Sequence, residues 1–166
     1  MICLTTTEST LTEALKQVER NRAYIDMVEL RLDLLDEDEL SSAQIFPRLC
    51  ALPTIATYRR VSDGGKSQLS DKNRMIRLRE IVLQGDFSYV DIEEDVKKSD
   101  LKIKGEDDLP RYDFENELKL KGIKIIRSFH DMEKLPANLF SLVTKLAKKG
   151  DIPKIAVTPN TIVDVV

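Results

Sequence analysis

The chain has 166 residues, of which 42% are hydrophobic and 33% charged, and its formal net charge is −3. This length fits one domain with a sizeable core. The slightly acidic balance argues against a nucleic-acid partner, which usually requires a basic excess on one face. No apolar stretch approaches the ~20 residues that span a membrane. We therefore expect a cytoplasmic protein with no signal peptide and no membrane partner.

Cysteine and histidine usage limits metal chemistry. Cys3 and Cys50 lie in apolar surroundings, so we expect two reduced, buried thiols and not a disulfide or a zinc site. The chain has one histidine, His130, and no Cys-x-x-Cys pair. Few ligands therefore remain for a transition metal, and we expect none.

Short β-rich runs alternate with longer helix-like segments. Several runs are almost continuously apolar, which is typical of parallel strands covered on both faces. In chain order the expected strands are Ile2–Thr6, Met27–Arg31, Thr54–Arg59, Tyr89–Glu93, Ile123–Ser128 and Ile152–Val157. Apolar spacing of three and four residues predicts helices over Leu11–Arg20, Asp71–Leu83, Phe114–Lys121 and Leu139–Ala147. Ser70 or Asp71 is the expected N-cap of the second helix, and Gly150 the stop after the last.

The segment from Asp95 to Glu117 is the hardest to interpret. It is highly charged and contains Gly105 and Pro110, so we expect a loop or a short irregular piece before the helix around Phe114–Lys121. No linker is long enough to divide the chain. The sequence therefore predicts a single domain over residues 1–166.

Six βα-type units favour an α/β fold, either a doubly wound sheet or a (β/α)₈ barrel. Polar residues gather where the expected strands end, and a barrel would collect them around one axis at its top face. An open sheet would spread them along an edge. We favour a TIM-barrel type fold that stops after its sixth strand.

The second expected strand carries charges on one face. Period-two alternation places Glu29, Arg31 and Asp33 together and the intervening leucines on the opposite face. In a barrel the charged face would be the interior, where charges are costly unless they pair or bind something. The alternative is a salt-bridged surface strand.

The third expected strand ends in Arg59-Arg60 and then opens into a loop with Gly64-Gly65. The planar fork of arginine suits a carboxylate or several hydroxyl groups, and two glycines would give a flap its mobility. The loop could equally be a simple turn, and Arg60 either solvated or functional. The fourth strand ends in Asp91 and Glu93, which could orient Lys154 or His130 or pair with the arginines; we favour pairing.

His130 and Lys154 are the candidates for chemistry. His130 follows an apolar run and can transfer protons near neutral pH, although a strand-end histidine satisfied by Asp131 or backbone is the alternative. Lys154 lies in an apolar stretch, and its alternative is an amine that reaches the surface. An unperturbed lysine is neutral in only roughly 1 in 2,500 molecules at pH 7. We expect burial and neighbouring cations to lower its pKa and create a nucleophile.

These segments together resemble the type I 3-dehydroquinate dehydratase family, a (β/α)₈ barrel of the shikimate pathway. Five segments match in order: Glu29-Leu30-Arg31, Thr57-Tyr58-Arg59 with Gly64-Gly65, Tyr89-Val90-Asp91-Ile92-Glu93, Ser128-Phe129-His130-Asp131, and Lys154-Ile155-Ala156-Val157 followed by Pro159. Each alone is weak, whereas five in the correct order are specific.

The resemblance implies a lyase of aromatic amino-acid biosynthesis that needs no cofactor. Lys154 would form a Schiff base with the C3 ketone of 3-dehydroquinate. His130 would remove a C2 proton and then protonate the departing C1 hydroxyl. Glu29, Arg31 and Arg59 would bind the substrate's hydroxyl and carboxylate groups. Asp63 lies where some members carry a glutamate, and we assign it no catalytic role.

The sequence departs from the family in ending after the sixth strand, where the family's barrel has eight βα units. The first and sixth strands would then have unpaired edges, which makes aggregation or a homodimer an expected behaviour. A class I aldolase-type lyase would also explain Lys154, but gives no reason for His130 and the arginines. A third alternative is a non-catalytic barrel fragment that serves for binding or as a scaffold.

Overall fold

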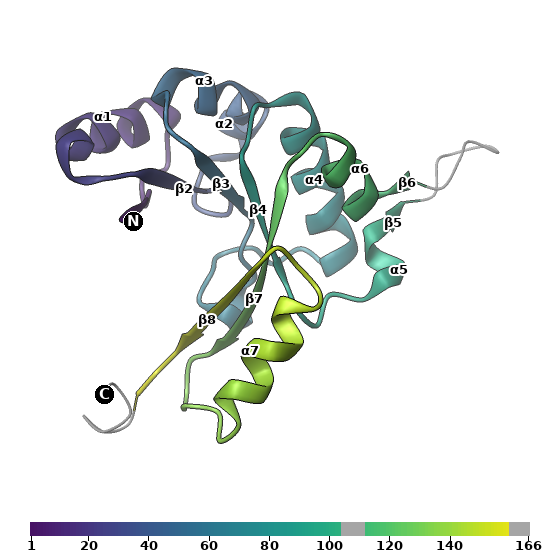
Figure 1. Cartoon of the computed structure of the whole chain (residues 1–166). Coiled ribbons are helices and arrows are strands. Elements are labelled where there is room, and N and C mark those ends of the chain that lie inside the picture. The colour runs from purple at the N-terminus through teal and green to yellow at the C-terminus, as the bar shows by residue number, and fades with distance from the viewer. Residues whose placement is uncertain (104–111, 160–166) are drawn as a thin grey trace.

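The computed structural model describes residues 1–103 and 112–159. Its main sheet contains six parallel strands whose spatial order follows the chain: β1 (Cys3–Thr5), β2 (Met27–Arg31), β3 (Thr54–Thr57), β4 (Tyr89–Glu93), β7 (Lys124–Asp131) and β8 (Ile152–Val157). The sheet curls, and the helices cover its outer face (Figure 1). A doubly wound sheet would reverse its strand order and carry helices on both faces. The predicted barrel class is therefore confirmed, as a half-barrel.

The outer layer contains more helices than the sequence predicted. The helices are α1 (Leu11–Asn21), α2 (Glu37–Leu40), α3 (Phe46–Cys50), α4 (Asp71–Gln84), α5 (Lys98–Leu101), α6 (Phe114–Leu120) and α7 (Leu139–Ala147). Short 3₁₀ turns lie at η1 (Arg22–Tyr24), η2 (Ala43–Ile45) and η3 (Val61–Asp63). All four predicted helices are present. The N-cap of α4 is Ser70, whose hydroxyl accepts a hydrogen bond from the Asn73 amide. In the described ranges, no helix is long and apolar enough to cross a membrane.

The segment predicted as a loop between Asp95 and Glu117 is partly regular. It contains α5 and a small antiparallel pair of strands, β5 (Lys102–Ile103) and β6 (Tyr112–Asp113). Gly105 and Pro110 lie outside the described residues. The expectation of irregular structure was therefore wrong for α5 and for the β5–β6 pair, because elements of four and two residues are too short to leave a sequence period.

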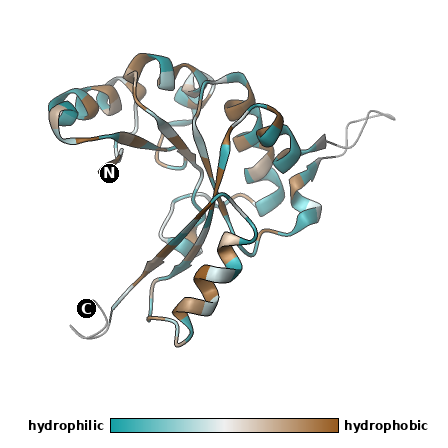
Figure 2. Cartoon of the chain, in the orientation of Figure 1, coloured by the Kyte–Doolittle hydropathy of each residue, from teal (hydrophilic) through white to brown (hydrophobic). Residues whose placement is uncertain are grey.

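Alternation along each strand divides the apolar residues between two clusters. Val28 and Leu30 face the helices and join the main core, whereas Met27 faces the inner side and packs with Ile55 and Ile126. Figure 2 shows hydrophobic colour running along the strands and alternating with hydrophilic colour around the helices. Burial of the helix-facing apolar surface is the main stabilising contribution, and the small inner cluster forms a base beneath the charged residues.

The strands β1 and β8 stand at the two ends of the sheet order, as the sequence led us to expect. This position corrects one prediction: Cys50 is buried but Cys3 is exposed, because β1 has a neighbour on one side in the described structure. Beside β8, α7 exposes Phe140, with 88% of its surface accessible.

Candidate active site

The inner face of the half-barrel carries a polar layer directly above its apolar base. One residue in two on each parallel strand points inward, so the strands contribute to a common layer. Its members, joined by hydrogen bonds and ion pairs, are Thr5, Glu29, Thr57, Asp91, Ser128 and Lys154. Two residues further along the chain lie Arg31, Glu93 and His130 on their strands and Arg59 just past the end of β3, towards the carboxyl ends where barrels place their active sites.

Lys154 is held between two carboxylates. Its Nζ donates to Glu29 Oε1 at 3.1 Å and to Asp91 Oδ2 at 3.0 Å. Burial favours the neutral amine, but the charges of Asp91 and Glu29 outweigh it and raise the pKa of Lys154. The expectation that neighbouring cations lower this pKa was therefore wrong, because the groups in contact with the amine are anions. About one third of the side chain, 33%, remains accessible.

Both carboxylates are themselves well satisfied. Burial opposes ionisation of Asp91, but Arg59 and Lys154 outweigh it and hold its pKa at about 2. Burial likewise opposes ionisation of Glu29, whereas Lys154 and the hydroxyls of Thr57 and Thr5 lower its pKa. These two acids are thus anions at neutral pH, and they fix the position of the lysine amine.

Arg59 connects the lysine to the histidine. Its Nη2 contacts Asp91 Oδ2 at 2.8 Å, the same oxygen that accepts from Lys154. Its Nη1 donates to Glu93 Oε1 at 2.7 Å and lies 3.5 Å from His130 Nδ1. The two alternatives for Asp91 and Glu93 thus combine: both pair with arginine, and Asp91 also orients Lys154.

His130 lies at the top of this group, with 6% of its side chain accessible. Burial, reinforced by the positive charge of Arg59, lowers its pKa to about 4. Asp63 Oδ2 lies 3.9 Å from Nδ1, which is beyond hydrogen-bonding distance. The imidazole is therefore neutral at pH 7, the form that can accept a proton.

Arg31 stands at the rim of the same face. Its Nε and Nη2 form a two-pronged pair with Asp33 at 2.9 and 2.7 Å. The Asp33 carboxylate also accepts the backbone amides of Arg59 and Lys66, both at 3.0 Å. Asp33 thus ties the end of β2 to the end of β3 and to the loop after it. The sequence placed Asp33 on this face but gave it no role.

A second residue to which the sequence gave no role, an arginine, enters from the helix layer. Arg74 of α4 is fully buried, and its Nη1 donates to both oxygens of Glu93, at 3.0 and 2.8 Å. Its Nη2 donates to Asp71 at 2.8 Å. Because Arg74 lies four residues before Leu78 on the apolar stripe, a charged residue on that stripe was the signal that could have revealed it.

The sequence profile of the Type I 3-dehydroquinase family matches residues 2–166. The chain belongs to the type I 3-dehydroquinase family. Among curated relatives, the 3-dehydroquinate dehydratase of Methanococcus vannielii is 34% identical over 99% of this chain and 70% of its own length. The protein of the same name from Methanococcus maripaludis strain C6 is 32% identical over 94% of this chain and 66% of its own.

Solved structures of type I 3-dehydroquinase family members show the same fold. The 3-dehydroquinate dehydratase of Aquifex aeolicus superposes with a TM-score of 0.75 at 28% identity, covering 99% of this chain and 69% of that one. The type I 3-dehydroquinate dehydratase of Clostridium difficile, solved with covalently modified comenic acid, gives a TM-score of 0.82 at 24% identity, covering 99% of this chain and 65% of that one. The chain thus spans about two thirds of the length of the proteins it matches.

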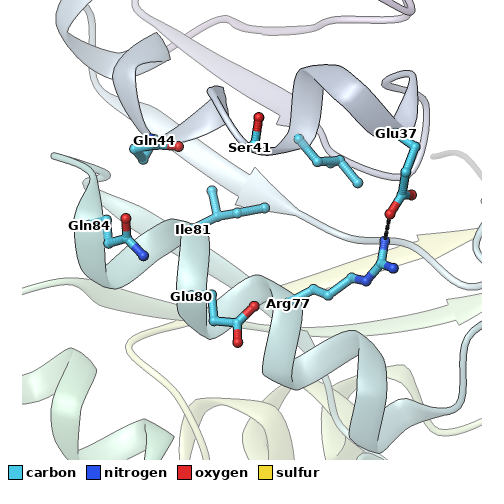
Figure 3. Close-up of a pocket in the computed structure, with 8 residues that line it drawn as sticks. Glu37, Ser41, Gln44, Arg77, Glu80, Ile81 and Gln84 are labelled. Atoms are coloured by element: carbon cyan, nitrogen blue, oxygen red, sulfur yellow. Dashed lines mark hydrogen bonds and ion pairs between the residues drawn. The ribbon is translucent and has the colours of Figure 1, made fainter.

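A separate groove of about 380 Å³ lies in the outer layer of this type I 3-dehydroquinase family member. Figure 3 shows it between the segment carrying Glu37, Ser41 and Gln44 and the face of α4 carrying Arg77 and Gln84. Arg77 Nη1 is paired with Glu37 at 2.6 Å. The groove therefore lies on the helix side of the sheet, away from Lys154 and His130.

Proposed function

We propose that this chain carries the Schiff-base dehydration site of a type I 3-dehydroquinate dehydratase, a hydro-lyase of the shikimate pathway. One observation carries the proposal: a lysine and a neutral histidine lie on the same inner face and contact the same Arg59–Asp91 ion pair. Membership of the family supports the substrate class.

The proposed reaction begins at Lys154. After the ammonium loses a proton, Nζ attacks the C3 ketone, and loss of water from the adduct gives an iminium. His130 then takes a proton from C2, and the iminium accepts the electron pair to give an enamine. Return of that pair expels the C1 hydroxyl, which His130 protonates to water. Hydrolysis of the remaining iminium consumes one water, releases 3-dehydroshikimate and regenerates the amine.

Three further residues complete the proposed substrate site. Two of the guanidinium nitrogens of Arg31 are bonded to Asp33, so we assign its Nη1 to the substrate carboxylate or a hydroxyl. Glu29 would accept a hydrogen bond from a hydroxyl once Lys154 has become an iminium. Arg59, only 3% accessible and bonded to two acids, would contribute mainly its charge.

Borohydride trapping tests this proposal directly. The folded protein is incubated with 3-dehydroquinate and reduced, and the mass increase is mapped by peptide analysis. We expect a single adduct on Lys154, lost in Lys154→Ala. It should be retained in Lys145→Ala, a lysine of α7 that pairs with Glu94 outside the site. His130→Ala should still be trapped but should not turn over.

Other outcomes would favour the alternatives. An adduct formed with aldol donors but not with 3-dehydroquinate would favour an aldolase-type lyase. No adduct with a folded protein would favour a binding or scaffold role.

A further inference from the structure

Arg60 binds carboxylates from three parts of the structure. Its Nε donates to Asp63 Oδ2 at 3.0 Å, and its Nη1 donates to Asp71 Oδ2 at 3.4 Å at the start of α4. Its Nη2 donates to both oxygens of Asp95, after β4, at 2.9 and 2.8 Å. With 22% of its side chain accessible, Arg60 is not a solvated strand-end arginine, which was one of its two sequence interpretations.

These contacts connect Arg60 to His130 by two routes. On one side, the Asp63 oxygen that Arg60 holds is the oxygen 3.9 Å from His130 Nδ1. On the other side, Asp71 also accepts a hydrogen bond from Arg74, and Arg74 donates to Glu93. Glu93 in turn accepts from Arg59, which lies beside the imidazole. A cavity of about 100 Å³ adjoins these residues, and Arg60, Asp63 and His130 all line it.

The charges that face His130 come from four elements. Arg59, two residues after β3, and Lys154 of β8 disfavour the imidazolium, whereas Asp91 of β4 and Asp63 of η3 favour it; Glu93 lines the adjoining cavity. In the described part of the chain, Asp63 is the carboxylate within ion-pair distance of the ring. A carboxylate hydrogen-bonded to imidazole stabilises the protonated ring. The separation of 3.9 Å and the neutralising charge of Arg60 both weaken that stabilisation.

We propose that Arg60 is a positioning residue for His130. By binding Asp63 Oδ2, Arg60 keeps this carboxylate out of hydrogen-bonding distance of the imidazole and preserves the neutral ring that proton abstraction requires. The role of His130 as base rests on the proposed function. The arrangement of the three side chains does not.

The single histidine of the chain makes this proposal measurable in the substrate-free protein. An NMR titration of the imidazole Cε1–H signal reports the pKa of His130 without ambiguity. In Arg60→Met we expect this pKa to rise by about one unit or more, because the released Asp63 can move to the ring. In Arg60→Lys, which keeps the charge but loses the fork, the rise should be smaller. The matched control Arg77→Met removes an arginine paired outside the site and should change nothing.

A double variant shows whether Arg60 acts on the pKa of His130 through Asp63 or directly through its own charge. If Arg60 acts through Asp63, Arg60→Met should produce no further rise when combined with Asp63→Asn. An equal rise with and without Asp63 would overturn the proposal, as would an unchanged pKa in both Arg60 variants. In active enzyme, the acid limb of kcat should move to higher pH by the same amount, with KM unchanged. Failure of borohydride trapping would count against the proposed function but would leave the titration result standing.

Discussion

Lys154 shows that the availability of a nucleophile depends on which charges touch it. A lysine among apolar residues indicates an amine with a lowered pKa, but alternation brings Glu29 and Asp91 to the same inner layer. The amine is consequently protonated in the resting protein. In the proposed reaction it must therefore lose a proton before each attack, and the rate of imine formation should rise with pH.

Removal of one acid should shift this dependence. Because Asp91→Asn removes a negative charge 3.0 Å from Nζ, the pKa of Lys154 should fall. We expect the rise of the borohydride-trapping rate with pH to occur about one pH unit lower than in the unmodified protein. Glu29→Gln should shift it in the same direction, and Asp86→Asn, which removes an exposed acid paired with Arg48, should leave it in place. If the pH dependence of trapping were unchanged in both inner-site variants, these acids would not determine the pKa of the Lys154 amine.

The low pKa of His130 predicts a pH dependence of folding stability. The folded protein binds a proton at this site near pH 4, whereas the unfolded chain binds it near pH 6.5. Between these values the unfolded state holds more protons, so stability falls as the pH is lowered from 6.5 to 4. We expect a loss on the order of 2 kcal/mol across this window. The Asp91 carboxylate has a pKa of about 2 in the folded protein, so the stability lost on its protonation is lost mainly below pH 4.

Urea unfolding at pH 7, 5.5 and 4.5 measures this loss. In His130→Asn, most of the decrease in the free energy of unfolding between pH 7 and pH 4.5 should disappear. The same slope in both proteins would assign the acid sensitivity to other groups.

At the level of elements, the loop after β3 depends on the absence of a side chain at Gly65. A Cβ there would lie 2.2 Å from the Arg59 carbonyl oxygen and 2.7 Å from the Arg59 Cβ. Gly64, with φ of 79°, ends the η3 turn in the left-handed region. The mobility of this loop remains a prediction, but its close packing on Arg59 is a separate requirement that Gly-Gly also meets.

Gly65→Ala should therefore disturb the site more than the fold. The added methyl group forces the loop off Arg59, at a cost of about 1 to 3 kcal/mol in the free energy of unfolding. We expect kcat/KM to fall at least tenfold, measured together with a thermal melt. Gly122→Ala is the control, because its φ of 72° imposes similar strain in open space far from the loop. Equal activity losses in the two variants would contradict a specific role for Gly65.

The elements differ in how well the sequence predicts them. The bounds of β2, β4 and β8 were predicted to the residue. β2 and β4 alternate apolar and charged residues, and β8 is apolar except at Lys154, so each pattern is typical of a strand. The helices α2 and α3 have four and five residues, too short for a 3.6-residue period to stand out. The polar contacts were hardest to predict: strand spacing gathers Glu29, His130 and Lys154 on one face, but not the contact of Arg74 with Glu93, which depends on how a helix packs.

Across the sheet as a whole, the two proposed catalytic residues lie towards one end. β3 and β4 are flanked by strands on both sides, whereas β8 pairs with β7 on one side in the described structure. Lys154 lies on β8 and His130 on β7. The contacts of Lys154 with Glu29 and Asp91 therefore join an edge strand to the centre of the sheet, and the ordering of this edge affects the geometry of the site.

Amide hydrogen exchange should show that the edge strand β8 opens more readily than the inner strands β3 and β4. Peptides covering Thr54–Thr57 and Tyr89–Glu93 should exchange slowest, since their opening approaches global unfolding, and the peptide covering Ile152–Val157 should exchange at least tenfold faster. Lys154→Met removes the two links from β8 to the inner acids and should accelerate exchange in β8 while leaving β3 and β4 unchanged. The measurement is exchange mass spectrometry at several protein concentrations. Protection of β8 equal to that of β4 and rising with concentration would instead mean that a second copy covers this edge, the homodimer that unpaired strands allow.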